Sequence, residues 1–429
     1  MTILTEKIFS EIGENLYTAV LDNGMKVYLI PKNDFQESCG MLVVNFGSLD
    51  NKFTQNGKVR NYEEGIAHFL EHKLFELENG QDVSELFTNA GANSNAFTTF
   101  DKTCFYFSTA DNLSENLALL QHFVSDTAFT EESIEREKSI IGQEIDMYQD
   151  DADYRLYQGI LENLYPKTAL AQDIAGTQDS VAKISVNDLK ENHEVFYSPQ
   201  EMALLVVGNF DKDVIFEQIQ DIQKESVKNA HHLERQKLIY EPVVPQKSVQ
   251  MEVVQPKLAI GLRGPALSVG MSTLRQELIL RIFFAMILGW TSKHYQELYE
   301  NGQIDDSFDF EVEVYENFQF LIISLDTPTP IAMATNLRQY LDKVAQSSDL
   351  EDLSKEHFEI VKKELYGDFF KSLDSIENLS AQFINHLSDE ETYLAVPKIL
   401  ATLTFEEVLN TGTEFVAKSD ATEFTILPK

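Results

Sequence analysis

The sequence predicts an α+β fold with two homologous domains, and three observations lead to this fold class. The chain has 429 residues, which is long for a single hydrophobic core. In each half, strand-like segments enclose a central group of helix-like segments. The two halves also share an internal repeat. We therefore expect each domain to be a mainly antiparallel sheet that is covered by helices on one face.

The first half opens with a β-hairpin. Residues 16–22 and 25–31 flank Asn23-Gly24, which is a strong two-residue turn signal. The later strand-like segments of this half are 39–48, 94–108 and 202–210, and its helix-like segments are 63–77, 82–90 and 112–165. This order is typical of helices that pack on an antiparallel sheet.

The internal repeat is clearest at the end of each half. A hydroxyl residue that can cap a helix, Ser185 or Thr404, is followed eleven residues later by Phe196 or Phe415. A short turn and a strand-like segment then close each copy. The spacing predicts that both halves end in a capped helix and a strand of the sheet.

A linker is expected between the two copies. Residues 226–246 are rich in Lys, Gln, His and Pro, which is a composition typical of linkers. The expected domains are therefore 1–225 and 247–429, and the second contains strand-like segments at 257–264 and 318–327.

The chain is strongly acidic. It has 70 acidic and 34 basic side chains and a formal net charge of −36, which excludes a protein that follows a nucleic-acid backbone. The surplus of acid can serve solubility, or it can line a cavity that favours basic peptides. The sequence leaves both interpretations open.

The cysteines and the N-terminus predict a cytoplasmic protein. Cys39 and Cys104 form no disulfide framework and no CxxC pair, so we expect them to be small buried residues in strands. The N-terminus lacks the pattern of a secretory signal. The most apolar stretch, 278–290, contains Arg281 and is too short to span a bilayer.

The sequence His68-Phe69-Leu70-Glu71-His72 lies in a predicted helix. Residues four apart project from one face of a helix, so His68 and His72 can share a metal ion. Glu71 lies on the same side and can reach a water molecule without binding the metal. The order H-x-x-E-H is the inverzincin motif, in which the acid is a general base.

A catalytic zinc needs a third protein ligand. The helix that begins after Thr130 carries Glu137 and Glu144, seven residues apart and close to its apolar stripe. A carboxylate buried there needs a cation or a strong donor, so one can bind zinc and the other can accept a hydrogen bond from a ligand histidine. Periodicity alone also allows the alternative that Glu137 and Glu144 are both charged side chains exposed to solvent.

The chain resembles the pitrilysin/insulysin-like family of inverzincin zinc metallopeptidases, and within it the zinc-bearing subunits of the paired bacterial processing-peptidase type. The resemblance rests on EGIAHFLEHKLF and EREKSIIGQE, supported by LDNGMKVYLIP and NAFTTFDKT. It implies one Zn²⁺ per chain held by His68, His72 and Glu144, with Glu71 as the catalytic base and Glu137 as a supporting acid. It also implies that the two domains form one half of a clam shell.

The resemblance further implies a zinc endopeptidase that acts on short or unfolded peptides. Asn95, Ala96 and Phe97 correspond to an edge strand that pairs with the substrate backbone, and Phe75 corresponds to an aromatic residue near the scissile bond. Phe75 and Phe97 can equally be ordinary core aromatics.

The second half departs from the family's active members. It contains no H-x-x-E-H, and Tyr299 and Asp306 stand where those members carry an Arg and a Tyr that hold the substrate carbonyl. We therefore expect a heterodimer with a homologous subunit that lacks the zinc motif and supplies these donors, or a homodimer. The alternatives are a catalytically silent scaffold, a peptide-binding clamp and a peptidase that acts without a partner.

Overall fold

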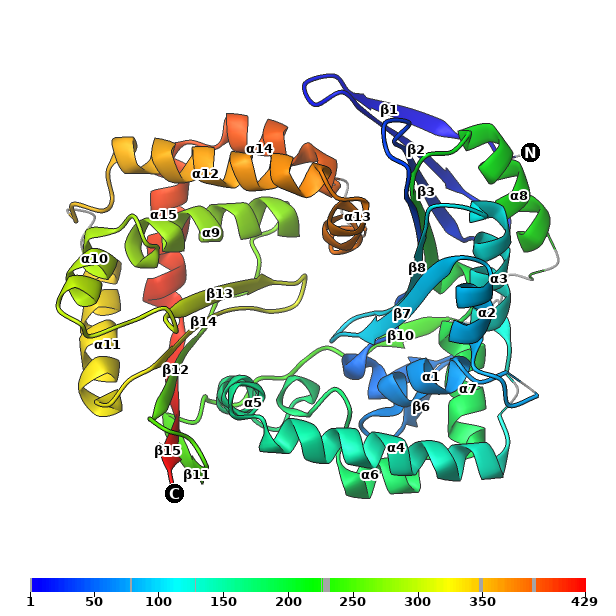
Figure 1. Ribbon diagram of the computed structural model, residues 1–429. Coiled ribbons are helices and arrows are strands. Elements are labelled where there is room, and N and C mark those ends of the chain that lie inside the picture. The colour runs from blue at the N-terminus through cyan, green and yellow to red at the C-terminus, as the bar shows by residue number, and fades with distance from the viewer. Residues whose placement is uncertain are drawn as a thin grey trace. The chain divides into compact units, whose positions relative to one another are not determined.

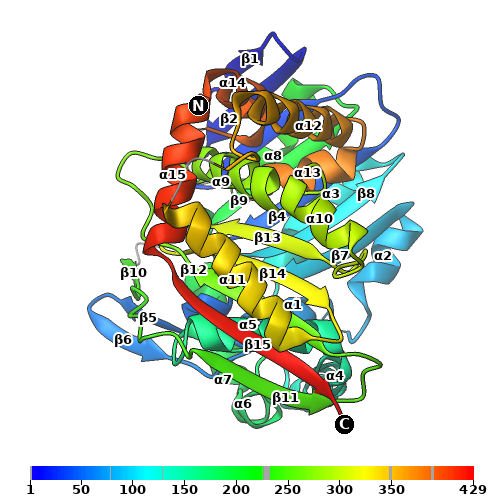
Figure 2. The same ribbon diagram turned by 90° about the vertical axis from the view of Figure 1, so that its left-hand side faces the viewer.

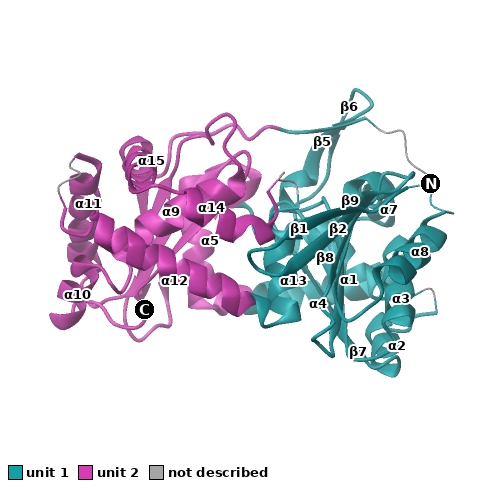
Figure 3. Cartoon of the chain, turned by 90° about the horizontal axis from the view of Figure 1, so that it is seen from above, with its two compact units in different colours: residues 1–147, 172–236, 373–387 teal, residues 148–171, 237–372, 388–429 magenta. Residues whose placement is uncertain are grey.

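The structure is a computed structural model with two compact units, each built on its own sheet (Figures 1 and 3). It describes residues 2–77, 79–127, 129–224, 226, 232–346, 350–387 and 391–429. Unit 1 comprises 1–147, 172–236 and 373–387, and unit 2 comprises 148–171, 237–372 and 388–429. The predicted α+β fold class with two similar halves is confirmed.

Unit 1 contains a seven-stranded sheet with the order β1-β2-β3-β9-β4-β8-β7. Among the described residues, β3 and β9 pair in parallel and the other neighbours are antiparallel. The strands are β1 (Thr5–Phe9), β2 (Glu14–Val20), β3 (Lys26–Pro31), β4 (Ser38–Val44), β7 (Ala92–Thr98), β8 (Thr103–Thr109) and β9 (Met202–Gly208). A small sheet joins β10 (Leu233–Arg235), β5 (Lys52–Gln55) and β6 (Lys58–Asn61).

The helices that follow one another along the first part of the chain cover one face of this sheet (Figure 1). They are α1 (Ile66–Leu74), α2 (Val83–Asn89), α3 (Leu113–Ser125), α4 (Glu131–Asp150), α6 (Gln178–Lys183), α7 (Val186–Phe196) and α8 (Lys212–Gln223). Short 3₁₀ turns occupy Ser48–Asn51 and Pro199–Glu201. The core of the unit forms where the inward side chains of these helices meet alternate residues of the strands.

Unit 2 contains a five-stranded sheet with the order β11-β15-β12-β14-β13 (Figure 2). Its strands are β11 (Gln246–Met251), β12 (Lys257–Arg263), β13 (Asp309–Val314), β14 (Gln319–Asp326) and β15 (Asp420–Pro428). Its helices are α5 (Ala152–Leu164), α9 (Thr273–Leu288), α10 (Lys293–Glu300), α11 (Pro330–Gln346), α12 (Lys355–Leu373), α14 (Val396–Thr402) and α15 (Phe405–Lys418), with 3₁₀ turns at Ala169–Ala171 and Tyr393–Ala395.

The two sheets repeat one topology, as the internal repeat predicts. The order β3-β9-β4-β8-β7 in unit 1 corresponds strand by strand to β11-β15-β12-β14-β13 in unit 2, and in each sheet the first pair is parallel. Ser185 and Thr404 cap their helices through their side chains, and the repeated Phe196 and Phe415 are buried. The sequence repeat therefore reflects a repeat in three dimensions.

Each unit takes one helix from the other half of the sequence. Helix α5 packs on β12 and β15 of unit 2, whereas α13 (Ile376–Ile384) packs on β4 and β9 of unit 1 (Figure 3). These helices hold equivalent places in the repeat, so the exchange is reciprocal. Because α13 lies on the face of the sheet opposite to the other helices, every residue of β4 and β9 is buried.

The exchange bears on the expected domain limits of 1–225 and 247–429. The chain passes from unit 1 to unit 2 after residue 236, within the expected linker at 226–246, of which residues 227–231 lie outside the described residues. A cut at this linker would separate α5 and α13 from the sheets that they cover. The domain limits stay a prediction.

Several local predictions are confirmed and two need correction. The Asn23-Gly24 turn joins β2 to β3, with Gly24 at a φ of 95°. Residues 94–108 are not one strand: β7 and β8 form a hairpin, because the Thr99 amide bonds to the Lys102 carbonyl and reverses the chain. The helix expected at 63–77 is shorter, since it begins after Gly65.

The structure also bears out the expected burial of the two cysteines. Cys39 and Cys104 are free, buried and in strands, as expected. Within the described residues, no helix has the length and apolar character needed to cross a membrane.

The exchanged helix provides a test of the packing. Phe383 of α13 is 0% exposed and packs edge to face on Tyr28 of β3, with ring centroids 5.6 Å apart. We expect Phe383→Ala to destabilise unit 1 by about 3–5 kcal/mol, because a large cavity opens against the sheet. Hydrogen exchange should become faster in β4 and β9 and stay unchanged in β12 and β14.

Ile360→Ala on α12 is the control, because Ile360 is 54% exposed and its loss should change stability by less than about 0.5 kcal/mol. Unchanged protection of β4 and β9 in Phe383→Ala would contradict the role of α13 in unit 1.

Candidate metal centre

Helix α1 presents two imidazoles on one face. The chain enters the helix at Gly65, whose φ of 88° disfavours other residues and whose added Cβ would lie 2.5 Å from the Ala175 carbonyl oxygen. The buried side chains of Ile66, Leu70 and Leu74 hold the opposite face against the core. The rings of His68 and His72 consequently lie side by side, with centroids 4.5 Å apart.

Helix α4 brings Glu144 to these imidazoles. The helix starts as predicted at Thr130, whose Oγ1 accepts a hydrogen bond from the Ser133 amide. The Oε2 of Glu144 lies 3.7 Å from Nε2 of His68 and 3.2 Å from Nε2 of His72. One ligand atom from each of the three residues lies within 4.8 Å of the others. The structure therefore brings the three predicted ligands together.

Glu137 supports one of the two histidines. Its Oε1 lies 2.9 Å from Nδ1 of His72, and the residue is 9% exposed. A hydrogen bond at Nδ1 fixes the ring so that Nε2 faces Glu144. In the described residues, Nδ1 of His68 has no such partner. The arrangement agrees with the predicted supporting position of Glu137.

Glu71 is held by a residue that the sequence analysis missed. Thr98 on β7 donates a hydrogen bond of 2.6 Å to Oε2 of Glu71. Oγ1 of Thr103 lies 3.3 Å from Oγ1 of Thr98 and donates its hydrogen bond to the Phe46 carbonyl. The hydroxyl proton of Thr98 is therefore left to bond with Glu71. Oε1 of Glu71 remains to accept a proton. No sequence signal indicates Thr98, because its contact with Glu71 depends on how β7 packs on α1.

The protonation of the site reflects burial and the neighbouring carboxylates. Burial, together with the charge of His72, lowers the pKa of His68 to about 4. Burial alone would lower the pKa of His72, but hydrogen bonds to Glu137 and Glu144 raise it to about 10. Burial raises the pKa of Glu71, and the bond from Thr98 opposes this rise. A proton on His72 thus compensates the carboxylates in the metal-free chain.

The donor set fits zinc. Two imidazole nitrogens and one carboxylate oxygen are the protein ligands of many catalytic zinc sites, which keep a fourth position open. The carboxylate already faces both nitrogens, so a cation between them would compensate the negative charge of the buried carboxylates. No groups other than these three residues meet the same geometric condition in the described part of the chain.

The residues predicted to bind substrate lie on and near β7. Asn95, Ala96 and Phe97 belong to this strand, which is the edge of the seven-stranded sheet beside β8. Phe75 ends α1 and its ring contacts Phe105 and Phe123, at centroid distances of 6.2 and 5.5 Å. Phe75 therefore packs partly into the core, while β7 offers a free edge.

Tyr299 and Asp306 lie in unit 2. Tyr299 is in the last turn of α10, is 50% exposed and stacks on Tyr295 at 6.0 Å. Asp306 is exposed and precedes β13. Neither side chain carries the cationic group of an arginine. Tyr299 and Asp306 therefore do not supply the positively charged donor that the family's active members have at this place.

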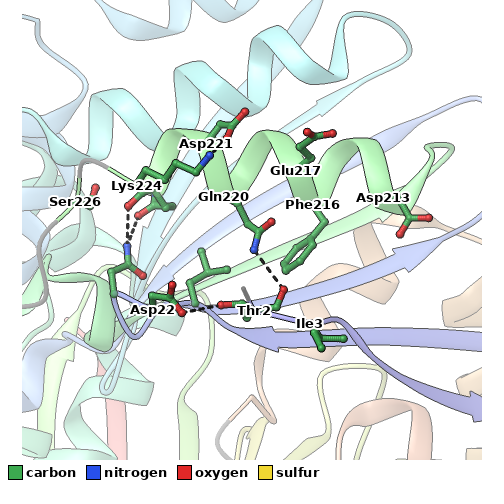
Figure 4. Close-up of a pocket in the computed structure, with 13 residues that line it drawn as sticks. Thr2, Ile3, Asp22, Asp213, Phe216, Glu217, Gln220, Asp221, Lys224 and Ser226 are labelled. Carbon is green, nitrogen blue, oxygen red and sulfur yellow. Dashed lines mark hydrogen bonds and ion pairs between the residues drawn. The ribbon is translucent and has the colours of Figure 1, made fainter.

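A pocket of about 730 Å³ lies elsewhere in unit 1, between α8 and the residues next to β1 (Figure 4). Asp22, Asp213 and Glu217 contribute to its wall, and Phe216 to its apolar side. None of the predicted site residues lines it, and its described lining contains no His or Cys. We therefore do not associate it with the metal centre.

Comparison with known proteins identifies the family. A model described as "Insulinase (Peptidase family M16)" matches residues 28–178, and one described as "Peptidase M16 inactive domain" matches residues 183–365. A zinc protease of Bacillus subtilis strain 168, named YmfH and described as uncharacterised, is 35% identical over 427 residues, which cover 98% of each chain. The chain belongs to peptidase family M16.

Solved M16 structures support the assignment. A putative M16-like peptidase from Alicyclobacillus acidocaldarius superposes with a TM-score of 0.90 at 29% identity, covering 98% of this chain and 100% of that one. An M16 inactive domain from Pseudomonas fluorescens has a TM-score of 0.80 over 97% of this chain and 98% of its own, but its identity of 14% shows the fold alone. The expected family resemblance is confirmed.

The metal site of this M16 chain can be tested by zinc binding. We expect one zinc per chain, and we expect His72→Ala and Glu144→Gln to lose it because each removes a ligand. Glu137→Gln should weaken zinc binding by about 10- to 100-fold through loss of support for His72. Metal analysis and competition with a chelator measure both effects.

Glu135→Gln is a suitable control, since Glu135 lies on α4 but pairs with Lys138 on the same helix. Equal zinc content in the wild-type chain and in both ligand variants would refute the assignment of these ligands.

Proposed function

We propose that the chain is a zinc-dependent endopeptidase and the metal-bearing subunit of a paired enzyme. The observation that supports this most is Glu71, a buried carboxylate beside His68, His72 and Glu144 with one oxygen held by Thr98. A structural zinc site has no need for such a base. The relatives named zinc proteases agree with a peptidase.

The chain's own residues suggest how the reaction proceeds. A bound zinc would supply a Lewis acid that polarises the scissile carbonyl and the attacking water. Glu71 accepts a proton from that water and returns it to the leaving amine. The bond from Thr98 keeps Glu71 in one orientation, and burial favours proton uptake by raising its pKa.

Substrate is proposed to bind along β7. The free edge of this strand can add an extended peptide by main-chain hydrogen bonds, with Asn95, Ala96 and Phe97 beside it. Thr98 ends the same strand, so a peptide paired with β7 lies next to the base. Backbone pairing favours short or unfolded peptides over folded proteins.

A homologous partner subunit is part of the proposal. Donors aimed at the developing oxyanion contribute about 3–4 kcal/mol to catalysis, and Tyr299 and Asp306 do not replace the family's Arg and Tyr. We propose a heterodimer with a subunit that lacks the zinc motif and carries these donors; a homodimer is the alternative. A cytoplasmic location remains part of this proposal, although the related PqqL of Escherichia coli is described as periplasmic.

Other functions make different predictions. A catalytically silent scaffold or a peptide-binding clamp of the same fold would bind without cleaving, whether or not Glu71 is present. A peptidase that acts alone would need no partner. The match of residues 183–365 to an inactive domain begins in unit 1 and continues into unit 2, and it does not include His68, His72 or Glu144.

Replacing Glu71 separates catalysis from metal binding. We expect Glu71→Gln to keep one zinc per chain and to lower peptide cleavage by at least about 10²- to 10⁴-fold, because the general base is lost. Glu135→Gln should keep full activity. If Glu71→Gln cleaves peptides at the wild-type rate, the proposed catalysis is wrong.

The partner is tested by reconstitution. The purified chain should cleave an unfolded peptide slowly, and a homologous subunit with the Arg and Tyr should raise the rate by about 10²- to 10³-fold, as expected for restored oxyanion donors. Cleavage and complex formation are measured in the same titration. Full activity of the chain alone would exclude the need for a partner.

A further inference from the structure

Lys73 follows His72 directly and is an unusual residue for its position. It is 0% exposed and ranks among the largest fully buried side chains, which are otherwise aromatic. A buried ammonium group needs a charged partner because it has left water. Lys73 finds this partner in Glu76, whose Oε2 lies 2.5 Å from its Nζ.

Glu76 connects this lysine to the second helix of the metal centre. Its other oxygen, Oε1, accepts a hydrogen bond of 2.6 Å from Arg136 on α4. Arg136 also lies 3.5 Å from Glu132 on its own helix, but that carboxylate is 89% exposed. The strong contact of Arg136 is therefore the one with Glu76, which lies two residues after the end of α1 and pairs with Lys73 in that helix.

Two polar links consequently join α1 and α4. The first runs from His72 to Glu137, and the second runs from Lys73 through Glu76 to Arg136. The two links start at neighbouring residues of α1, His72 and Lys73. They end at neighbouring residues of α4, Glu137 and Arg136. Glu144 lies about two helical turns, roughly 10 Å, beyond them along α4, so its place opposite the imidazoles depends on how α4 is held.

We infer that Lys73, Glu76 and Arg136 form a positioning relay that holds α4 in register with α1, so that Glu144 meets His68 and His72 at the distance a metal requires. This inference rests on the proposed zinc site. The relay residues do not contact the metal ligands' donor atoms; they act through the helices that carry them.

Charge alone predicts the opposite effect, which makes the inference testable. Removing a positive charge near a cation site strengthens cation binding by simple electrostatics. If Arg136 instead positions α4, its removal displaces Glu144 and weakens cation binding. Arg136→Gln therefore distinguishes the two, and its side chain is 54% exposed, so the variant should fold.

Zinc affinity is measured by competition with a chelator for the wild-type chain, Arg136→Gln, Arg136→Lys and Lys73→Met. We expect Arg136→Gln to weaken zinc binding by about 10- to 100-fold, the range seen when ligand support is lost, and Arg136→Lys to recover most of the affinity. Lys73→Met should also weaken zinc binding. The absorption bands of bound Co²⁺ should shift in Arg136→Gln, because the ligand geometry changes.

Lys138→Gln is the matched control. It removes the same charge from the same helix, but Lys138 pairs with Glu135 and the Ala182 carbonyl and not with α1. The thermal unfolding of the metal-free Arg136→Gln should match that of this control. Unchanged or tighter zinc binding in Arg136→Gln, or equal weakening in Lys138→Gln, would overturn the relay.

The wild-type chain separates this inference from the proposed function. If the wild-type chain binds no zinc, the proposed function fails and the relay with it. If the wild-type binds zinc and Arg136→Gln binds it equally well, the relay alone fails.

Discussion

The contact between α1 and α4 is the constraint on which the rest of the site depends. Glu137 and Glu144 would be costly to bury alone. The two helices place them against His72 and His68, and His72 and Glu137 are 65 positions apart in the chain. The His72–Glu137 distance of 2.9 Å leaves little freedom for either helix. The close approach at Gly65 and the core packing of Leu70 on α1 and Ile141 on α4 keep these helices in place. Glu71, the proposed base, also depends on this arrangement, because it shares α1 with both histidines.

The reciprocal exchange of α5 and α13 places a second constraint on the fold. The strands β4 and β9 are buried on both faces, and α13, which covers one of them, comes from the other half of the sequence. An isolated first half would therefore expose an apolar sheet face, a feature that favours association or aggregation. The repeat looks like two copies of one domain in sequence, yet neither copy contains all of the helices that bury its own sheet. The two halves are thus interdependent for packing, independently of any shared chemistry.

Local patterns were readable from the sequence, and contacts across the fold were not. The Asn23-Gly24 turn, the caps at Ser185 and Thr404 and the shared face of His68 and His72 each depend on a few neighbouring residues, so spacing predicted them. The family resemblance added Glu144, which periodicity alone left between two interpretations. Thr98 was missed because its partner lies 27 residues away on another element. The hairpin within 94–108 was missed because its turn at residues 99–102 contains neither glycine nor proline. The exchange of α13 leaves no mark in local composition, since an apolar helix face does not indicate which sheet it covers.

The two units show how one topology can hold a cluster of polar, ionisable side chains in one copy and apolar side chains at the corresponding places in the other. Helix α12 is the counterpart of α4 in the repeat, and Phe369, beside the position that corresponds to Glu144, is 2% exposed and packs on Tyr393. Helix α9, the counterpart of α1, buries an almost continuous apolar surface and carries no imidazole. At these places unit 2 therefore buries apolar side chains, whereas unit 1 buries carboxylates that require compensation by a proton or a cation. A contact between buried charges is costly in free energy, and the buried carboxylate of Glu71 beside it agrees with the proposal that these charges serve catalysis.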